Sequence, residues 1–133
     1  MGLQLSAFEK RIEIRWSDLD SSQHVNNAVY LSYLEEVRTA WLDEALRNAG
    51  AVMDFVLAHV EIDFKRELTL DDTAVVARCT LARVGTSSIR TAEEILTERG
   101  ELAARAEAVV VARDPATGAS RPLSDAERSA LGE

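Results

Sequence analysis

The sequence predicts an α+β fold in which a five-stranded antiparallel sheet packs against one long helix. Three observations lead to this prediction. One long stretch carries apolar residues at helical spacing, the segments around it alternate between apolar and polar residues, and the later segments are joined by short turns. Short turns require antiparallel neighbours, because parallel strands need long crossovers. Since the chain shows no internal repeat and no linker, we expect residues 1–133 to form a single domain.

The first expected strand covers residues 8–16, where Ile12, Ile14 and Trp16 alternate with charged residues. A polar segment, residues 17–27, follows it and is rich in Ser, Asp and Asn. This segment is too long and too polar for a tight turn, and it contains no second regular element. We therefore expect a loop that runs from the strand into the helix.

The helix is expected to begin near Ala28, where the period of the apolar residues changes, and to run for roughly 20 residues. Asn26 or Asn27 is suited to cap its start, and Gly50 supplies a stop. Its apolar stripe is broad, which indicates a helix wrapped on more than one side. The stripe contains Tyr30, Tyr33, Leu34, Val37, Trp41 and Ala45, and it is opposed by a polar face of Glu35, Glu36, Arg38, Asp43 and Arg47.

Four more strands follow, each ended by turn residues. On the polar side of the first of them, His59 is expected at the surface or in an interface. Ser124 and Glu127 form a capping box, which predicts a short final helix. The expected strands are residues 56–64, 74–84, 86–97 and 102–113.

The net charge, the apolar runs and the cysteine count of the chain argue against several classes of function. A net charge of −8 argues against a nucleic-acid-binding protein, because neutralising phosphates needs a basic surface. No apolar run approaches the ~20 residues of a membrane span, and the first residues lack the pattern of a signal peptide. One cysteine, Cys79, allows neither an intrachain disulfide nor a metal site built on several cysteines. These features lead us to expect a cytoplasmic protein that binds no membrane.

The loop before the helix concentrates the candidate chemistry. Asp18, Asp20, His24, Asn26 and Asn27 lie within ten residues of one another. A helix N-terminus offers N–H groups that polarise a carbonyl, and a nearby carboxylate is able to attack that carbonyl or activate water. The alternative is that these are ordinary turn and cap residues, with Asp18 in particular bonding local backbone. A single loop histidine makes a metal site improbable, and we expect none.

The same loop carries motifs of a known family. Asp18-Leu19-Asp20, His24-Val25-Asn26-Asn27 and the aromatic-rich start of the helix at Tyr30 occur in the family order and spacing. The segments 60–64, 83–88 and 114–118 match the family's second strand, hairpin turn and late turn. In these motifs the chain resembles the 4-hydroxybenzoyl-CoA thioesterase-like branch of the hotdog superfamily, over nearly its whole length.

The resemblance implies a hotdog fold, in which the sheet wraps around the long helix, and a homodimer or tetramer with active sites at the dimer interface. It makes Asp20 the catalytic carboxylate and the backbone N–H of Asn27, seven positions later, the donor to the thioester carbonyl. His24 joins them in the catalytic set. The substrate-binding set that it implies is Asn26, Tyr30, Arg83, Gly85, Ser87 and Ser88.

Two members of that set have ordinary alternatives. Tyr30 stands on the apolar stripe with Tyr33, Leu34 and Trp41, where a core role is the more common one. The hairpin of the family's prototype is rich in basic residues, whereas here it offers Arg83 followed by small residues. Arg83 and Arg90 also fit ordinary strand-face positions.

The implied function is hydrolysis of an acyl-CoA thioester to free acid and CoA, without a cofactor. Asp20 would act as nucleophile or as general base, and the residues do not separate these routes. The alternatives are an acyl-ACP thioesterase on the same scaffold and a non-catalytic acyl-CoA-binding hotdog domain. A hotdog dehydratase or hydratase is less favoured, because the histidine-based signature of those enzymes is missing.

Overall fold

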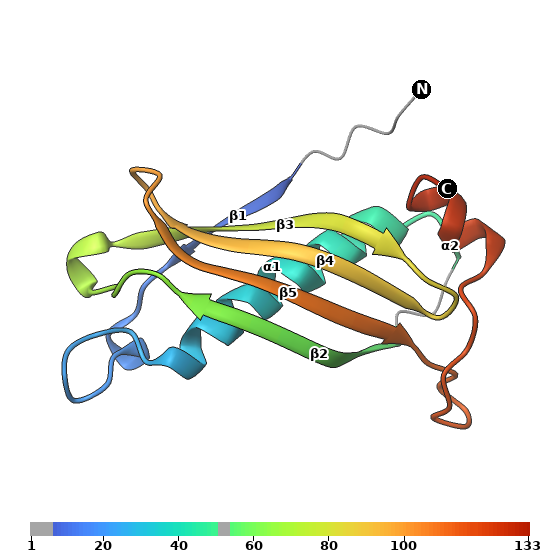
Figure 1. The fold of residues 1–133 in the computed structure, drawn as a ribbon, viewed down its shortest axis with the longest axis horizontal. Coiled ribbons are helices and arrows are strands. Elements are labelled where there is room, and N and C mark those ends of the chain that lie inside the picture. The colour runs from blue at the N-terminus through green and yellow to red at the C-terminus, as the bar shows by residue number, and fades with distance from the viewer. Residues whose placement is uncertain (1–6, 51–53) are drawn as a thin grey trace.

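A computed structural model of the chain describes residues 7–50 and 54–133 (Figure 1). Two short 3-10 turns, Trp16–Asp18 and Leu70–Asp72, accompany the regular elements. The strands are β1 (Phe8–Glu13), β2 (Phe55–Phe64), β3 (Ala74–Val84), β4 (Ser88–Thr97) and β5 (Leu102–Ala112), and the helices are α1 (Asn27–Leu46) and α2 (Asp125–Ala130).

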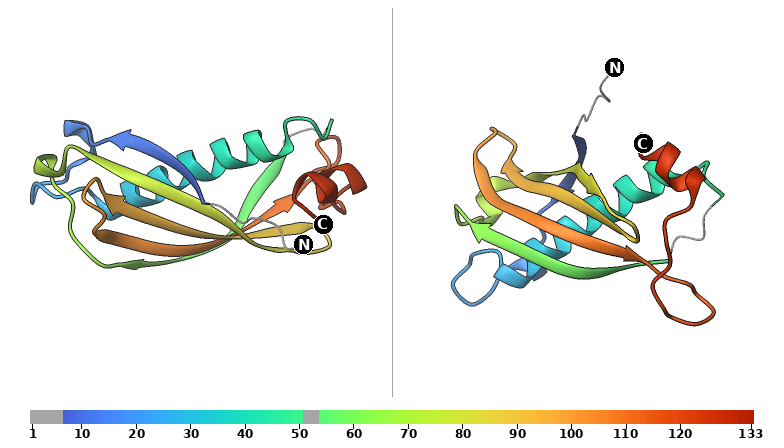
Figure 2. Two further views of the ribbon diagram at one scale, coloured as in Figure 1. Left: turned by 90° about the horizontal axis from the view of Figure 1, so that it is seen from above. Right: turned by 45° about the vertical axis from the view of Figure 1, so that its right-hand side comes forward.

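The five strands form one sheet in the order β1-β3-β4-β5-β2, with every neighbouring pair antiparallel. β1 and β2 are therefore the edge strands. The sheet curves around α1, which lies along its concave side (Figure 2). This arrangement confirms the predicted fold class and the wrapped helix. No helix in the described ranges is long and apolar enough to cross a membrane.

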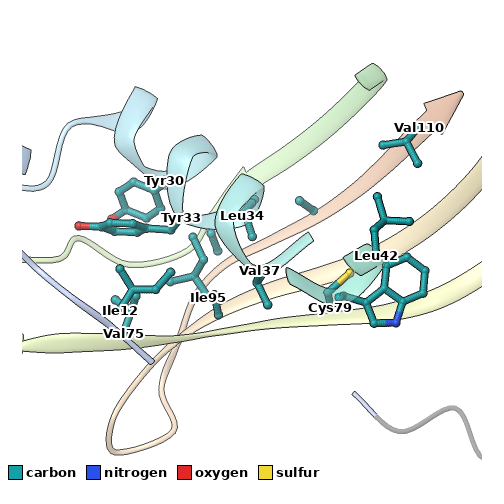
Figure 3. Packing of buried hydrophobic residues seen from close by; sticks show 14 of the residues in the cluster. Ile12, Tyr30, Tyr33, Leu34, Val37, Leu42, Val75, Cys79, Ile95 and Val110 are labelled. Atoms are coloured by element: carbon teal, nitrogen blue, oxygen red, sulfur yellow. The ribbon is translucent and has the colours of Figure 1, made fainter. Parts of the chain in front are cut away.

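The core lies between α1 and the concave face of the sheet. Tyr33, Leu34 and Val37 on α1 are at most 1% exposed. They face buried side chains of the sheet such as Val75 and Ile95 (Figure 3). Burial of these apolar side chains is the main force that fixes α1 on the sheet, and with it the position of the loop before α1.

Two predictions about the first strand were wrong. β1 ends at Glu13 and not at residue 16, and Trp16 is 77% exposed although it continues the alternation of Ile12 and Ile14. The cause is local, because the Asp18 carboxylate accepts the backbone N–H of Arg15 at 2.9 Å and closes a tight turn. The chain leaves the strand direction before the position of Trp16.

The prediction that Arg38 lies on the polar face of the helix was also wrong. Arg38 is 5% exposed and points toward the sheet, where its guanidinium makes a bidentate ion pair with Glu93 of β4 at 2.8 and 3.0 Å. Glu93 is fully buried, and its carboxylate also accepts the hydroxyl of Thr91 at 2.7 Å. The core of this protein thus contains a hydrogen-bonded charge pair.

Candidate active site

The loop between β1 and α1 folds back on itself as a small antiparallel ladder. Leu19 and Val25 pair as a bridge, the N–H of Asp20 donates to the carbonyl of His24 at 2.9 Å, and the N–H of Asn26 donates to the carbonyl of Asp18 at 3.0 Å. The ladder carries Asp20 alongside the residues that lead into α1. The residues of the sequence motif therefore form a hydrogen-bonded ladder and not an open loop.

Buried hydrogen bonds anchor this ladder to the core. The hydroxyl of Tyr33 donates to Oδ2 of Asp18 at 2.7 Å, and the N–H of Val25 donates to the carbonyl of Leu68 at 2.8 Å. Burial, followed by the neighbouring Asp18 carboxylate, raises the pKa of Tyr33, so its hydroxyl stays protonated as a donor. Asp18 is 5% exposed and bonds local backbone, as the alternative interpretation of this residue expected.

Asp20 lies in a different environment, partly exposed on the outer part of the loop. Its Oδ1 accepts the backbone N–H of Ser22 at 3.0 Å and the hydroxyl of Ser22 at 2.5 Å. These hydrogen bonds, the hydroxyl first, lower the pKa of Asp20, so the carboxylate is ionised at neutral pH. Ser22 was not identified from the sequence, although an Asp followed two positions later by Ser is a common turn pattern.

The start of α1 provides a hydrogen-bond donor at the same end of the helix as this carboxylate. Asn26 caps the helix, since its Oδ1 accepts the N–H of Ala28 at 2.8 Å. In residues 7–50 and 54–133, the N–H of Asn27 has no acceptor. As the first residue of the helix, Asn27 has no intrahelical partner, and the helix dipole adds partial positive charge there. This N–H is suited to a carbonyl oxygen.

His24 lies beside the turn that holds Asp20. Its Nε2 lies 3.3 Å from a carboxylate oxygen of Glu67, and its Nδ1 lies 3.5 Å from the hydroxyl of Ser22. The imidazole thus joins the segment after β2 to the turn that holds Asp20. Glu67 is a second residue of this neighbourhood that was not identified from the sequence, because it reaches His24 only through the fold.

Tyr30, in the first turn of α1, is 2% exposed. Its hydroxyl donates to the carbonyl of Arg66 at 2.9 Å, and its ring packs edge-on against Phe64, with 5.1 Å between the ring centroids. These contacts agree with a core role. The expectation that Tyr30 binds substrate stays a prediction.

The other predicted binding residues lie in the hairpin between β3 and β4. The N–H of Gly85 donates to the carbonyl of Ser88 at 2.7 Å, and a side chain at Gly85 would meet the Ser88 hydroxyl, which would have to move aside. A hollow of about 140 Å³ is lined by Arg83, Gly85, Ser88, Arg90 and Val109. Arg90 pairs with Glu107 at 3.2 Å, whereas Arg83 has no ion-pair partner in the described chain.

The hairpin and the loop lie at opposite ends of the sheet (Figure 1). Glu13, at the end of β1, stands opposite Ala74 at the start of β3, and the hairpin begins after Val84 at the other end of β3. A strand of that length spans about 30 Å. Within this chain, the structure therefore gathers Asp20, His24, Asn26, Asn27 and Tyr30 at one end and leaves Arg83, Gly85, Ser87 and Ser88 at the other.

The loop end has what acyl transfer requires. An ionised carboxylate and an unused helix N–H lie at the same end of α1, and groups of these kinds are able to act as a base or nucleophile and as a carbonyl polariser. Among the residues that the structure describes, no group of three His, Cys, Asp or Glu side chains is close enough to hold a metal ion.

Comparison with known proteins places the chain among thioesterases. Residues 14–131 match the model of the thioesterase-like superfamily. The chain is 30% identical over 105 residues to the long-chain acyl-CoA thioesterase FadM of Escherichia coli K12, and the match covers 74% of this chain and 76% of FadM.

Solved structures agree with the fold. The PA2801 protein of Pseudomonas aeruginosa superposes with a TM-score of 0.82 at 26% identity, over 96% of this chain and 100% of that one. A thioesterase of Thermus thermophilus, crystallised with coenzyme A and Zn, superposes with a TM-score of 0.79 at 31% identity, over 94% and 97% of the two chains. The hotdog fold that the sequence motifs imply is thereby confirmed.

Proposed function

This chain is a member of the thioesterase-like superfamily, and on that premise we propose that it hydrolyses acyl-CoA thioesters with Asp20 as its catalytic carboxylate. The observation that carries the proposal is that an ionised carboxylate and a free helix N–H lie at the same end of α1. Asp20 is ionised and partly exposed, and the Asn27 N–H has no acceptor among the described residues.

The chemistry follows from these two groups. The thioester oxygen accepts the N–H of Asn27, and the positive end of the helix stabilises the negative charge that develops on it. Asp20 then either attacks the carbonyl carbon, forming a mixed anhydride that water cleaves, or removes a proton from the attacking water. In both routes the C–S bond breaks, CoA leaves as a thiolate that takes up a proton, and water supplies the oxygen of the acid. No cofactor is needed.

The hairpin is the proposed binding site for CoA. Arg83 is a cation without an ion-pair partner in the described ranges, and it borders a hollow beside Gly85 and Ser88. Guanidinium groups bind phosphates well. We propose that Arg83 contacts a phosphate of CoA and that Ser87 and Ser88 lie along the pantetheine arm.

A site divided between two ends of the sheet requires a second subunit. β2 is an edge strand whose backbone is open to pairing, and it exposes Leu57 by 49% and Phe64 by 45%. Antiparallel pairing of β2 with β2 of a second copy, around a two-fold axis, turns the partner end for end. The partner's hairpin then lies at the same end as Asp20. We therefore propose a homodimer with two shared sites, which leaves open its further assembly into a tetramer.

The carrier is proposed to be CoA and not ACP. An ACP is strongly acidic, so its docking would favour a basic rim, and a chain with a net charge of −8 is a poor match. A CoA-dependent reaction also fits the expected cytoplasmic location. Turnover of one acyl group on CoA and on ACP tests this choice, and faster turnover of the ACP ester would contradict it.

The activity itself is tested with acyl-CoA esters. Release of free thiol is measured across straight chains from short to long and with an aromatic ester. We expect turnover, with the long chains preferred as in the activity for which FadM is named. A chain that hydrolyses none of these esters, but binds them, would be a non-catalytic acyl-CoA-binding domain.

A further inference from the structure

The two oxygens of the Asp20 carboxylate differ in their surroundings. Oδ1 accepts two hydrogen bonds from Ser22, one from its N–H at 3.0 Å and one from its hydroxyl at 2.5 Å. Oδ2 has no hydrogen-bond partner in residues 7–50 and 54–133. A carboxylate held by one oxygen presents the other in a fixed direction.

We propose that Ser22 is a positioning residue for thioester hydrolysis, whose hydroxyl holds Oδ1 of Asp20 and thereby presents Oδ2 to the thioester. The inference rests on the proposed function, in which Asp20 is the reacting group. It adds a residue that the family motif in this chain does not include, and it assigns different tasks to the two oxygens of one carboxylate.

The distances decide where the single hydroxyl proton of Ser22 goes. The Ser22 oxygen lies 2.5 Å from Oδ1 of Asp20 and 3.5 Å from Nδ1 of His24. Hydrogen bonds to a carboxylate are the shorter and stronger kind, so the proton points at Asp20. The contact with His24 is longer, and the tautomer of the imidazole sets which of its two atoms donates. His24 is thus connected to Asp20 through Ser22.

Few charged groups face this cluster. The titratable side chain that faces Asp20 is His24, from the same loop. Glu67, in the segment after β2, faces His24 from the other side at 3.3 Å. The hydroxyl of Ser22 is the largest of the influences that lower the pKa of Asp20. Without it, Asp20 would take up a proton at a higher pH, and the acidic limb of the rate profile would move upward.

If the Ser22 hydroxyl only stabilised the turn, its removal would lower the melting temperature of the protein. The backbone bond from Ser22 to Oδ1 survives loss of the hydroxyl, and Ser22 is exposed, so Ser22→Ala is expected to fold with an unchanged melting temperature. Ser21 is an exposed serine one position away, so Ser21→Ala is the matched control. Ser22→Thr keeps a hydroxyl and is the rescue variant.

The test compares these variants on one long-chain acyl-CoA across pH. For Ser22→Ala we expect kcat to fall roughly tenfold, as small misplacements of a reacting group do, with KM unchanged and the acidic limb of kcat/KM at higher pH. Ser22→Thr should restore both properties, and Ser21→Ala should match the wild type.

Any other pattern overturns the proposal. An unchanged kcat or an unmoved acidic limb in Ser22→Ala would show that the hydroxyl does not act on Asp20. A large drop in its melting temperature would show a structural role. The proposed function fails separately if Asp20→Asn retains full activity. If Asp20→Asn is inactive while Ser22→Ala matches the wild type, only the role of Ser22 is wrong.

Discussion

Asp18 and Asp20 are two positions apart in one loop, yet their surroundings give them different tasks. Asp18 is buried and accepts hydrogen bonds from Tyr33 and from the backbone of Arg15. Asp20 is partly exposed, and one of its oxygens is unoccupied in the described chain. We infer that Asp18 holds the loop and that Asp20 performs the chemistry.

The bond between Tyr33 and Asp18 is open to a direct test. Tyr33→Phe removes the hydroxyl and leaves a buried carboxylate with one donor fewer. We expect a loss of about 1–3 kcal/mol in the free energy of unfolding, the usual cost of an unsatisfied buried group. Chemical denaturation measures it. A stability equal to that of the wild type would show that the loop is held by other contacts.

At this scale the sequence named candidate residues, whose roles stay predictions, but not the contacts that each one makes. The motif identified Asp20, His24 and Asn27 by position. It did not identify Ser22, since the same Asp-x-Ser pattern is common in ordinary turns. It also misplaced Trp16, because the turn closed by Asp18 interrupts an alternation that is regular in the sequence.

At the scale of elements, α1 is joined to the sheet by a charge pair as well as by apolar packing. The bidentate contact between Arg38 of α1 and Glu93 of β4 is buried between the helix and the sheet. Such a pair requires one register of helix on sheet, since a shift along the helix would leave both charges buried and unpaired. The register of α1 also sets where its first N–H groups lie.

Removing one member of this ion pair should lower the free energy of unfolding. Arg38→Met leaves Glu93 without its partner in a fully buried position, and we expect a loss of about 3–5 kcal/mol in the free energy of unfolding. The double variant Arg38→Met with Glu93→Leu should recover most of that loss. Equilibrium unfolding of both variants checks this, and a single variant as stable as the double one would contradict it.

The elements themselves were largely predictable. Apolar spacing indicated the long helix and the later strands to within a few residues, and the capping box at Ser124 correctly predicted α2. The placement of Arg38 was not predictable from α1 alone. An arginine beside an apolar stripe normally reaches solvent, and only β4 brings Glu93 to meet it.

At the scale of the whole molecule, the chain carries the two halves of the proposed site at opposite ends of its sheet (Figure 1). The sequence motifs identify both halves but contain nothing about the distance between them, which depends on the length and direction of β3. We propose that two-fold pairing of the β2 edges brings the loop half of the site in one chain next to the hairpin half in its partner.

Shared sites predict complementation between two inactive variants. Asp20→Asn removes the reacting group, and Arg83→Glu repels CoA phosphates at low substrate concentration. In a mixed dimer, one site receives both defects and the other receives none. Random reassociation of equal amounts should therefore restore about a quarter of the wild-type activity. Unmixed variants are the controls, and no gain on mixing would place both halves of the site in one subunit or rule out the dimer.

The central claim is that the carboxylate of Asp20 drives thioester hydrolysis, and Asp20→Asn tests it most directly. The amide keeps the shape of the side chain but is neither base nor nucleophile. Single-substrate kinetics with the preferred acyl-CoA should show kcat reduced by on the order of 10²–10⁴, while CoA binding and the melting temperature stay at their wild-type values. A variant that turns over its substrate at the wild-type rate would contradict the account.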